Sequence, residues 1–172
     1  MITRIAFTGK MCSGKDTATD YLVRKGFTKL SFADPIRELA CKVYGTEQSV
    51  ERRRFMQEVG QAGRRVNPLI WIQPVVMTVQ QWPDAMFTLN DIRFPNELTA
   101  LKWLGFEVYR IVASEGLRIK RHKERNGYAP TREALDDISE TALDDVYLPE
   151  LDGELPIPEF YKAIDRILEG LQ

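Results

Sequence analysis

Apolar and polar positions follow two different periods along the chain, and the switches between them predict where strands give way to helices. Short apolar runs indicate buried strands, whereas apolar residues three or four positions apart predict amphipathic helices. Strands are expected at residues 4–7, 28–32, 85–89, 107–112 and 146–148. Helices are expected at residues 15–25, 35–44, 51–63, 68–81, 95–104, 115–125 and 158–171.

This alternation of strands and helices is typical of an α/β fold. It predicts a mainly parallel sheet of roughly five strands, flanked by helices, with ligands bound at the carboxyl ends of the strands. A chain of 172 residues suits one hydrophobic core. Residues 1–172 are therefore expected to form a single domain.

Composition and charge narrow the classes of function. Hydrophobic residues make up 44% of the chain and charged residues 28%, as in an ordinary globular protein. The formal net charge is -1, so no general field draws the chain to nucleic acid or to an anionic membrane. No apolar run reaches the roughly 20 residues that span a bilayer. Cys12 and Cys41 have neither disulfide nor metal-ligand spacing, and residues 1–4 are no signal peptide, so a cytoplasmic location is expected.

A glycine-rich motif lies between the first expected strand and the first expected helix. Residues 9–15 read Gly-Lys-Met-Cys-Ser-Gly-Lys, which fits the G-x-x-x-x-G-K pattern of phosphate-binding loops. Backbone amides of such a loop surround a phosphate, the helix N-terminus adds positive charge, and Lys15 reaches the β- and γ-phosphates. The alternative is a glycine-rich turn without a ligand, but the position between strand and helix favours binding. The residues expected to hold ATP with its Mg²⁺ are Gly9, Lys10, Cys12, Ser13, Gly14, Lys15, Asp16 and Thr17.

Metal binding in this loop is open, because Asp16 stands where the usual motif has a Ser or Thr that binds Mg²⁺. Asp16 can hold the ion, orient the acceptor or stabilise the helix N-terminus by its charge. Thr17 is a second candidate ligand. Asp91, which follows the strand expected at 85–89, is a third, with a helix cap as its alternative role.

Three arginines mark the helix expected at 115–125. Arg118, Arg121 and Arg125 are three and four positions apart, so they share one helix face. Such a face can close over a triphosphate, neutralise the charge that develops during transfer and exclude water. The alternative is a solvated basic face.

Three short motifs carry a resemblance to a known family. They are Ser-Gly-Lys-Asp-Thr at 13–17, Phe-Ala-Asp-Pro at 32–35 and Asp-Ile-Arg-Phe-Pro-Asn-Glu at 91–97. In this order they resemble the motifs of the deoxynucleoside monophosphate kinases of bacteriophages. The likeness extends from the first strand to the closing helix, including Ser139-Glu140 and Asp152-Gly153, but it is loose over 126–145. The first motif also resembles that of animal phosphomevalonate kinases, whereas 91–97 favours the nucleotide enzymes.

The resemblance implies a P-loop NTPase core with a helical acceptor-binding region at about 35–82 and a lid at about 115–145. It implies transfer of the γ-phosphate of ATP to a deoxynucleoside monophosphate, in the host cytoplasm if the protein is phage-encoded, and it allows a homodimer. The catalytic residues that it implies are Lys15, Asp16, Arg93 and Arg121. The acceptor-binding residues are Phe32, Asp34, Arg37, Arg64, Arg65, Trp71 and Arg93, with Trp71 and Phe32 as candidates to stack on a base.

Several of these residues also have an alternative interpretation in which they bind no ligand. Arg37, Arg64 and Arg65 can be ordinary solvated arginines, and Phe32 and Trp71 can be core aromatics. Two other functions also fit the loop. One is a kinase for another phosphorylated metabolite, such as phosphomevalonate or dephospho-coenzyme A, and the other is an ATP-binding regulatory module without a small acceptor.

Overall fold

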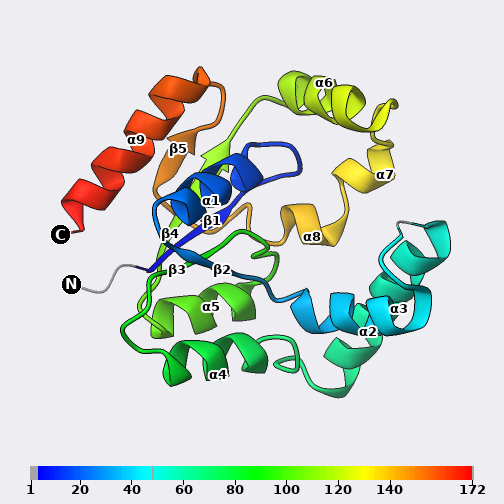
Figure 1. Cartoon of the computed structure of the whole chain (residues 1–172). Coiled ribbons are helices and arrows are strands. Elements are labelled where there is room, and N and C mark those ends of the chain that lie inside the picture. The colour runs from blue at the N-terminus through cyan, green and yellow to red at the C-terminus, as the bar shows by residue number, and fades with distance from the viewer. Residues whose placement is uncertain (1–3, 48, 172) are drawn as a thin grey trace.

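A five-stranded sheet forms the centre of the computed structural model, which describes residues 4–47 and 49–171 (Figure 1). The strands are β1 (Arg4–Thr8), β2 (Thr28–Leu30), β3 (Phe87–Leu89), β4 (Glu107–Val112) and β5 (Glu150–Asp152). Their order in the sheet is β2-β3-β1-β4-β5, and each of the four pairings is parallel. This confirms the predicted α/β class with a parallel sheet.

Helices connect the strands and cover the sheet. They are α1 (Lys15–Arg24), α2 (Asp34–Tyr44), α3 (Val50–Val66), α4 (Gln73–Gln81), α5 (Pro95–Trp103), α6 (Glu115–Asn126), α7 (Arg132–Leu135), α8 (Ile138–Thr141) and α9 (Ile157–Gly170). Within the described residues no helix is long and apolar enough to cross a membrane.

The alternation of β1 divides the core into two layers, because successive side chains of a strand point to opposite faces. Ile5 and Phe7 belong to one buried cluster and Ala6 to the other. The first cluster packs α1 and α9 on one face of the sheet, through Ala18, Leu22, Phe160 and Ile164. The second packs α4 and α5 on the other face, through Val75, Val79, Leu98 and Leu101. Strand β1, at the centre of the sheet, is therefore covered on both sides.

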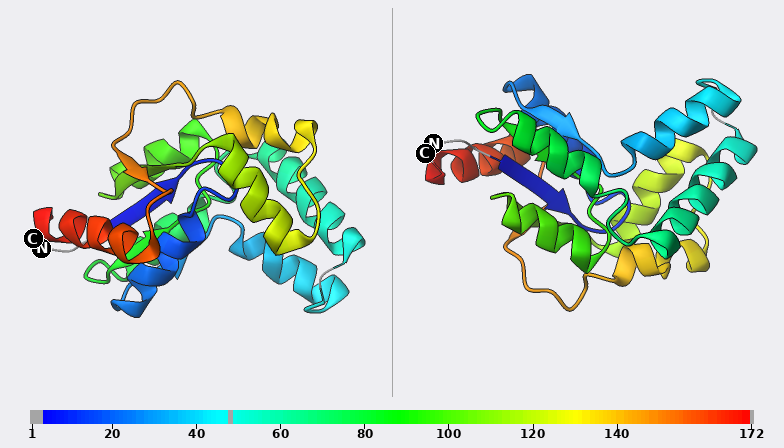
Figure 2. Two further views of the ribbon diagram at one scale, coloured as in Figure 1. Left: turned by 90° about the horizontal axis from the view of Figure 1, so that it is seen from above. Right: turned by 90° about the horizontal axis from the view of Figure 1, so that it is seen from below.

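Two helical arms extend beyond the carboxyl ends of the strands (Figure 2). One arm is α2 with α3, and the other is the chain from α6 to α8 (Figure 1). A cleft between them is lined by Ile36 and Met56 on the first arm and by Ile138 on the second. The sheet thus presents its carboxyl edge to a space enclosed by helices.

The fifth strand was predicted at 146–148, and that prediction is wrong, because β5 is Glu150–Asp152. The apolar run before it serves the core without pairing in the sheet: Leu148 is buried, and the Val146 carbonyl accepts a hydrogen bond from Arg110 Nη2 at 2.8 Å. Strand β4 pairs instead with 150–152, beginning with Arg110 opposite Glu150. An apolar run alone cannot show which of two neighbouring segments takes up the ladder.

Candidate active site

The loop between β1 and α1 has the backbone that a phosphate-binding loop needs. Gly9 and Gly14 have φ values of +133° and +118°, which L side chains rarely adopt. A Cβ on Gly9 would also lie 2.3 Å from the carbonyl oxygen of Ile111 on β4. The two glycines therefore let the loop turn sharply while it lies against the sheet.

Lys15 is folded back over this loop. Its Nζ donates hydrogen bonds to the carbonyl oxygens of Gly9, at 2.7 Å, and Lys10, at 2.8 Å. Burial, and next the positive charge of Arg93, lower the pKa of the Lys15 ammonium to about 8. The partners of the ammonium group in these two bonds are neutral carbonyl groups, and an anion at the same place would stabilise its positive charge more strongly.

Asp16 lies in the first turn of α1 and joins the loop to two neighbouring elements. Asn90, directly after β3, donates from Nδ2 to Asp16 Oδ1 at 2.8 Å. Arg125 of α6 lies 3.4 Å from Asp16 Oδ2. Asp16 and Thr17, the two metal candidates of the loop, line the same cavity. Either can contribute an oxygen to a cation there.

Asp91, the third metal candidate, is engaged elsewhere. Its carboxylate accepts hydrogen bonds from the Ser31 hydroxyl, at 2.5 Å, and from the backbone amides of Phe32 and Ala33, at 3.2 and 3.1 Å. These bonds fix the turn that leads from β2 into α2. The contacts of Asp91 thus support the anchoring of a turn and give no support to direct metal binding.

No group of three metal-ligating side chains occurs within residues 4–47 and 49–171. Proteins commonly hold Mg²⁺ with one or two side chains together with phosphate oxygens and water. Asp16 and Thr17 are two oxygen-bearing side chains that line one cavity.

The α6 arginines reach the loop. Arg121 donates from Nη1 to the carbonyls of Cys12 and Ser13, both at 3.3 Å, and from Nη2 to that of Gly153 at 2.8 Å. Arg118 is buried, with Nε bonded to the Ala113 carbonyl at 3.2 Å. Helix α6 therefore lies against the loop.

A cavity of about 230 Å³ separates this helix from α1 and α9. Cys12, Gly14 and Lys15 line it from the loop, and Arg121 and Arg125 from α6. Its apolar wall, formed by Leu155, Ile157 and Phe160, suits the flat ring of a nucleotide base.

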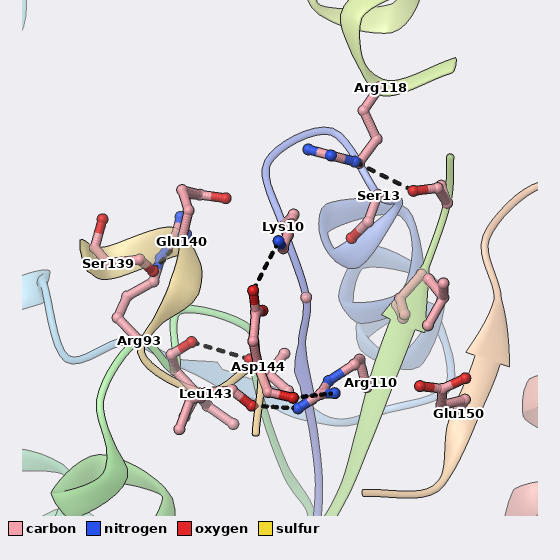
Figure 3. Close-up of a pocket in the computed structure, with 16 residues that line it drawn as sticks. Lys10, Ser13, Arg93, Arg110, Arg118, Ser139, Glu140, Leu143, Asp144 and Glu150 are labelled. Atoms are coloured by element: carbon pink, nitrogen blue, oxygen red, sulfur yellow. Dashed lines mark hydrogen bonds and ion pairs between the residues drawn. The ribbon is translucent and has the colours of Figure 1, made fainter. Parts of the chain in front are cut away.

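A second cavity, of about 360 Å³, lies on the other side of the loop, beneath α8 (Figure 3). Its lining mixes charges of both signs: Lys10, Arg93, Arg110, Arg118, Glu140, Asp144 and Glu150. The Ser13 hydroxyl also lines it, buried and without a hydrogen-bond partner in the part of the chain that the structure describes. A buried orphan hydroxyl beside basic groups fits an anion such as phosphate.

The cleft between the two arms carries the arginines predicted to meet the acceptor. Arg64, Arg65 and Arg93 line it together with Arg53 of α3. The Arg64 guanidinium lies 4.9 Å from the ring centroid of Phe94, and its Nη2 lies 3.6 Å from Glu97 Oε1. Burial raises the pKa of Glu97, whose Oε2 accepts the backbone amides of Arg93, at 2.7 Å, and Phe94, at 3.0 Å. Glu97 thus positions both the turn that carries Arg93 and the side chain of Arg64.

Arg37 lies in a neighbouring hollow. It donates from Nη1 to Ser31 Oγ, at 2.8 Å, and to Asp34 Oδ1, at 2.7 Å. It lines that hollow with Arg52 and Arg53. Asp34, predicted to contact the acceptor, is thus the partner of an arginine predicted to do the same.

The two aromatic residues proposed to stack on a base are core residues in this structure, which corrects that hypothesis. Phe32 is 2% exposed and belongs to the α4–α5 cluster. Trp71 is 8% exposed and donates from Nε1 to the Gly60 carbonyl at 2.9 Å. A Cβ on Gly63 would lie 2.4 Å from its ring. The ring is therefore clamped against α3 and offers no face to a ligand.

Sequence reasoning assigned no role to Asn90, Glu140 or Gly153. Asn90 could have been found as a polar residue that directly follows a strand, where ligand-binding residues gather. Glu140 and Gly153 belong to short stretches that share the resemblance, but no spacing in the sequence connects them to the loop. Only the fold brings them there.

No protein-family model matches the chain. The chain is 30% identical over 154 residues to "Uncharacterized protein ORF77" of Ictalurid herpesvirus 1, covering 83% of this chain and 68% of that protein. It is also 30% identical over 143 residues to the "Putative deoxynucleotide monophosphate kinase" of Acanthamoeba polyphaga mimivirus, covering 62% of this chain and 72% of that protein.

Solved structures share the fold. TT1252 from Thermus thermophilus superposes with a TM-score of 0.65 at 18% identity, covering 99% of this chain and 98% of that one. A gluconokinase from Sinorhizobium meliloti 1021 superposes with a TM-score of 0.58 at 14% identity, covering 98% and 95%.

Fold and glycine-rich loop together define the class of the protein, an α/β protein with the P-loop fold that it shares with solved kinases. Within that class the chain belongs to the family of viral proteins that includes ORF77 of Ictalurid herpesvirus 1 and the mimivirus protein named above.

Proposed function

We propose that the protein is a deoxynucleoside monophosphate kinase, which transfers the γ-phosphate of ATP to a dNMP and gives a dNDP and ADP. The observation that carries this proposal is the position of Arg93, which lines both the cavity beside the phosphate loop and the arginine-lined cleft. A guanidinium shared by two anion sites suits transfer between two phosphorylated substrates. The printed name of the mimivirus relative supports the same substrate class.

On this proposal the triphosphate of ATP lies along the loop. Lys15 and Arg121 exchange their carbonyl partners for phosphate oxygens, which is favourable because a cation binds an anionic oxygen more strongly than a neutral carbonyl oxygen. Asp16 and Thr17 hold Mg²⁺, which neutralises phosphate charge when it is bound. The base rests against Leu155 and Phe160.

The acceptor occupies the cleft between α3 and α8. Arg64, Arg65 and Arg93 supply the positive charge for its phosphate, and planar guanidinium groups bind phosphate through two parallel hydrogen bonds. Gln57 and Gln61, one helical turn apart on α3, line the same cleft and offer amides to the edge of a base. The cleft thus provides for both ends of a nucleotide.

Transfer forms a bond between an acceptor phosphate oxygen and the γ-phosphorus of ATP and breaks the bond from that phosphorus to the β–γ bridging oxygen, so ADP leaves. The acceptor oxygen is already anionic and needs no general base. The chain's task is to align the two phosphates and to stabilise the charge of the transferring group. On this proposal Lys15, Arg93 and Arg121 perform this task, which is supported by their positions in the two cavities beside the loop.

Release of ADP from ATP and Mg²⁺ tests the proposal, with all deoxynucleoside and ribonucleoside monophosphates, phosphomevalonate and no acceptor as parallel reactions. We expect release that depends on at least one dNMP. Lys15→Ala should lower kcat by about 10²–10³-fold, as loss of a charge-stabilising group does, while Lys120→Ala, on the exposed side of α6, should leave it unchanged. Release that depends only on phosphomevalonate, or on no acceptor, would refute the assignment.

A further inference from the structure

We infer that the Glu140 carboxylate occupies the anion position of the phosphate loop in the nucleotide-free protein, and that nucleotide has to displace it, which releases Arg93 toward the acceptor cleft. The inference rests on the proposed function only where it names ATP as the displacing anion and a dNMP as the acceptor. The contact between Glu140 and the loop does not depend on that function.

The first observation is a backbone contact. The Met11 amide, within the phosphate loop, donates a hydrogen bond to Glu140 Oε2 at 2.5 Å. Loops of this kind direct their amides at an anion. Here the anion comes from α8, far along the chain (Figure 3).

The second observation is the remaining environment of this carboxylate. Its Oε1 pairs with Arg93 Nη1, and the Glu140 charge also acts on Lys15, raising the pKa of that ammonium against the larger lowering effects. The Glu140 side chain is 6% exposed. A carboxylate so buried is stable only when it is paired, and its partners here are groups that a phosphate would use.

The third observation is that the segment around Glu140 borders both cavities. Ser139 and Glu140 line the cavity beside the loop, whereas Asp137, Ile138 and Ser139 line the acceptor cleft. A second contact joins this region to the phosphate loop: Nζ of Lys10, in the loop, lies 2.9 Å from Oδ2 of Asp144, which follows α8. A movement of Glu140 would therefore change both sites.

Two consequences follow for binding. A phosphate and a carboxylate repel each other and compete for the Met11 amide. Only molecules in which Glu140 has left the loop can bind ATP, so the apparent affinity for ATP is the intrinsic affinity multiplied by the fraction of such molecules. Once Glu140 leaves, Arg93 loses its carboxylate partner and is free to bind a second phosphate. ATP should thus increase the affinity for the acceptor, and by linkage the acceptor should increase the affinity for ATP to the same extent.

The test uses the full chain and three variants. Glu140→Asp keeps the negative charge but shortens the side chain by one methylene group, so it breaks the contact alone. Glu140→Gln removes the charge as well. Glu169→Gln, at the exposed end of α9, is the matched control for the change in net charge.

Hydrogen exchange of the Met11 amide without nucleotide tests the contact itself. We expect slower exchange in the wild type and in Glu169→Gln, and exchange about five- to tenfold faster in both Glu140 variants, the range set by a fraction of about 80–90% of molecules in which Glu140 is seated in the loop. Equal exchange in all four proteins would overturn the inference.

Calorimetric titration with ATP tests displacement. We expect the dissociation constant of both Glu140 variants to fall about five- to tenfold below that of the wild type, a range set by a seated fraction of about 80–90%. If ATP binding became tighter in Glu140→Gln but not in Glu140→Asp, the effect would come from the negative charge of Glu140 and not from its contact with the loop, which would overturn the inference. Weaker binding in the Glu140 variants, or no ATP binding by any of the proteins, would overturn it too.

Titration with a dNMP, with and without a non-hydrolysable ATP analogue, tests the coupling. The analogue should tighten dNMP binding in the wild type and do so much less in Glu140→Asp. ATP displacement without dNMP-dependent ADP release would leave the inference standing and refute the proposed function, so the two failures are distinguishable.

Discussion

The backbone of Gly153 lies so close to the Ser13 carbonyl that a Cβ on Gly153 would be 2.2 Å from that oxygen. The same Cβ would lie 3.0 Å from the Val112 carbonyl oxygen. Both neighbours are backbone atoms, which cannot rotate away as the end of a side chain can. The residue that follows β5 therefore sets the position of the phosphate loop.

Gly153→Ala should push the loop out of place. We expect the free energy of unfolding to fall by about 1–3 kcal/mol, the usual cost of overpacking, and the dissociation constant for ATP to rise at least about tenfold, because a shift of about one ångström disrupts aligned donors. Urea unfolding and calorimetry measure the two effects. Gly116→Ala, in α6 with open space around the new methyl group, should leave both nearly unchanged. ATP binding of wild-type strength in Gly153→Ala would contradict the argument.

The lowered pKa of Lys15 predicts how nucleotide affinity depends on pH. Above about pH 8 the free protein increasingly holds Lys15 as the neutral amine, so ATP has to bring a proton with it. The dissociation constant for ATP should rise with pH from about 8, by up to about tenfold per unit. In Lys15→Arg, where the charge does not titrate in this range, this rise should be absent.

The same group has the opposite effect on stability. Its pKa in the folded chain, about 8, lies below its usual value of 10.5, so the unfolded chain binds more protons between these values. The Lys15 contribution to the free energy of unfolding should therefore increase as pH rises from 8 to 10.5, by at most about 3 kcal/mol. The difference between the wild type and Lys15→Met, measured by urea unfolding across this range, isolates that contribution. A difference that does not change with pH would show that burial does not perturb Lys15.

Asp16→Asn tests the role of the loop carboxylate. The variant keeps an oxygen that can accept from Asn90 but loses the charge that pairs with Arg125 and attracts a cation. If Asp16 helps to hold Mg²⁺, the Mg²⁺ concentration for half-maximal activity should rise about tenfold or more. Asp20→Asn, an exposed change on the same helix, is the control. A lower kcat with an unchanged Mg²⁺ requirement would assign Asp16 to the alignment of groups instead.

Trp71→Phe separates packing from ligand binding. Phenylalanine keeps an aromatic face but loses the hydrogen bond to Gly60 and fills less of the space against Gly63. The free energy of unfolding should fall by about 1–3 kcal/mol, from the lost bond and the cavity. The KM for the acceptor should change less than twofold. A large rise in that KM at unchanged stability would restore the base-stacking hypothesis.

The periodicity of the chain predicts the order of strands and helices well, because burial of one face leaves a direct pattern in the sequence. It fails at β5, where two neighbouring segments both supply core residues and only the ladder partner distinguishes them. Trp71 shows the same limit for single residues. The sequence gives the residue type, which is the same whether an aromatic side chain stacks on a base or packs in the core.

The candidate site divides in the same way. Gly9, Gly14 and Lys15 are visible in the sequence because a continuous loop fixes their spacing. Glu140 and Gly153 meet that loop across long distances in sequence, from α8 and from the end of β5. These contacts depend on the three-dimensional path of the chain from β4 through α8 to β5, and no local sequence pattern predicts that path.

The cavity proposed for the nucleotide has one wall from residues 12–17 and another from residues 153–160, and strands β2 to β5 lie between these two segments in the sequence. On the ribosome the phosphate loop is made early, yet its counterpart appears only after β4 and β5 have been synthesised. A growing chain that has not reached Phe160 has no complete nucleotide cavity. ATP can therefore stabilise the finished fold but cannot guide its early stages, so the first steps of folding depend on the chain alone.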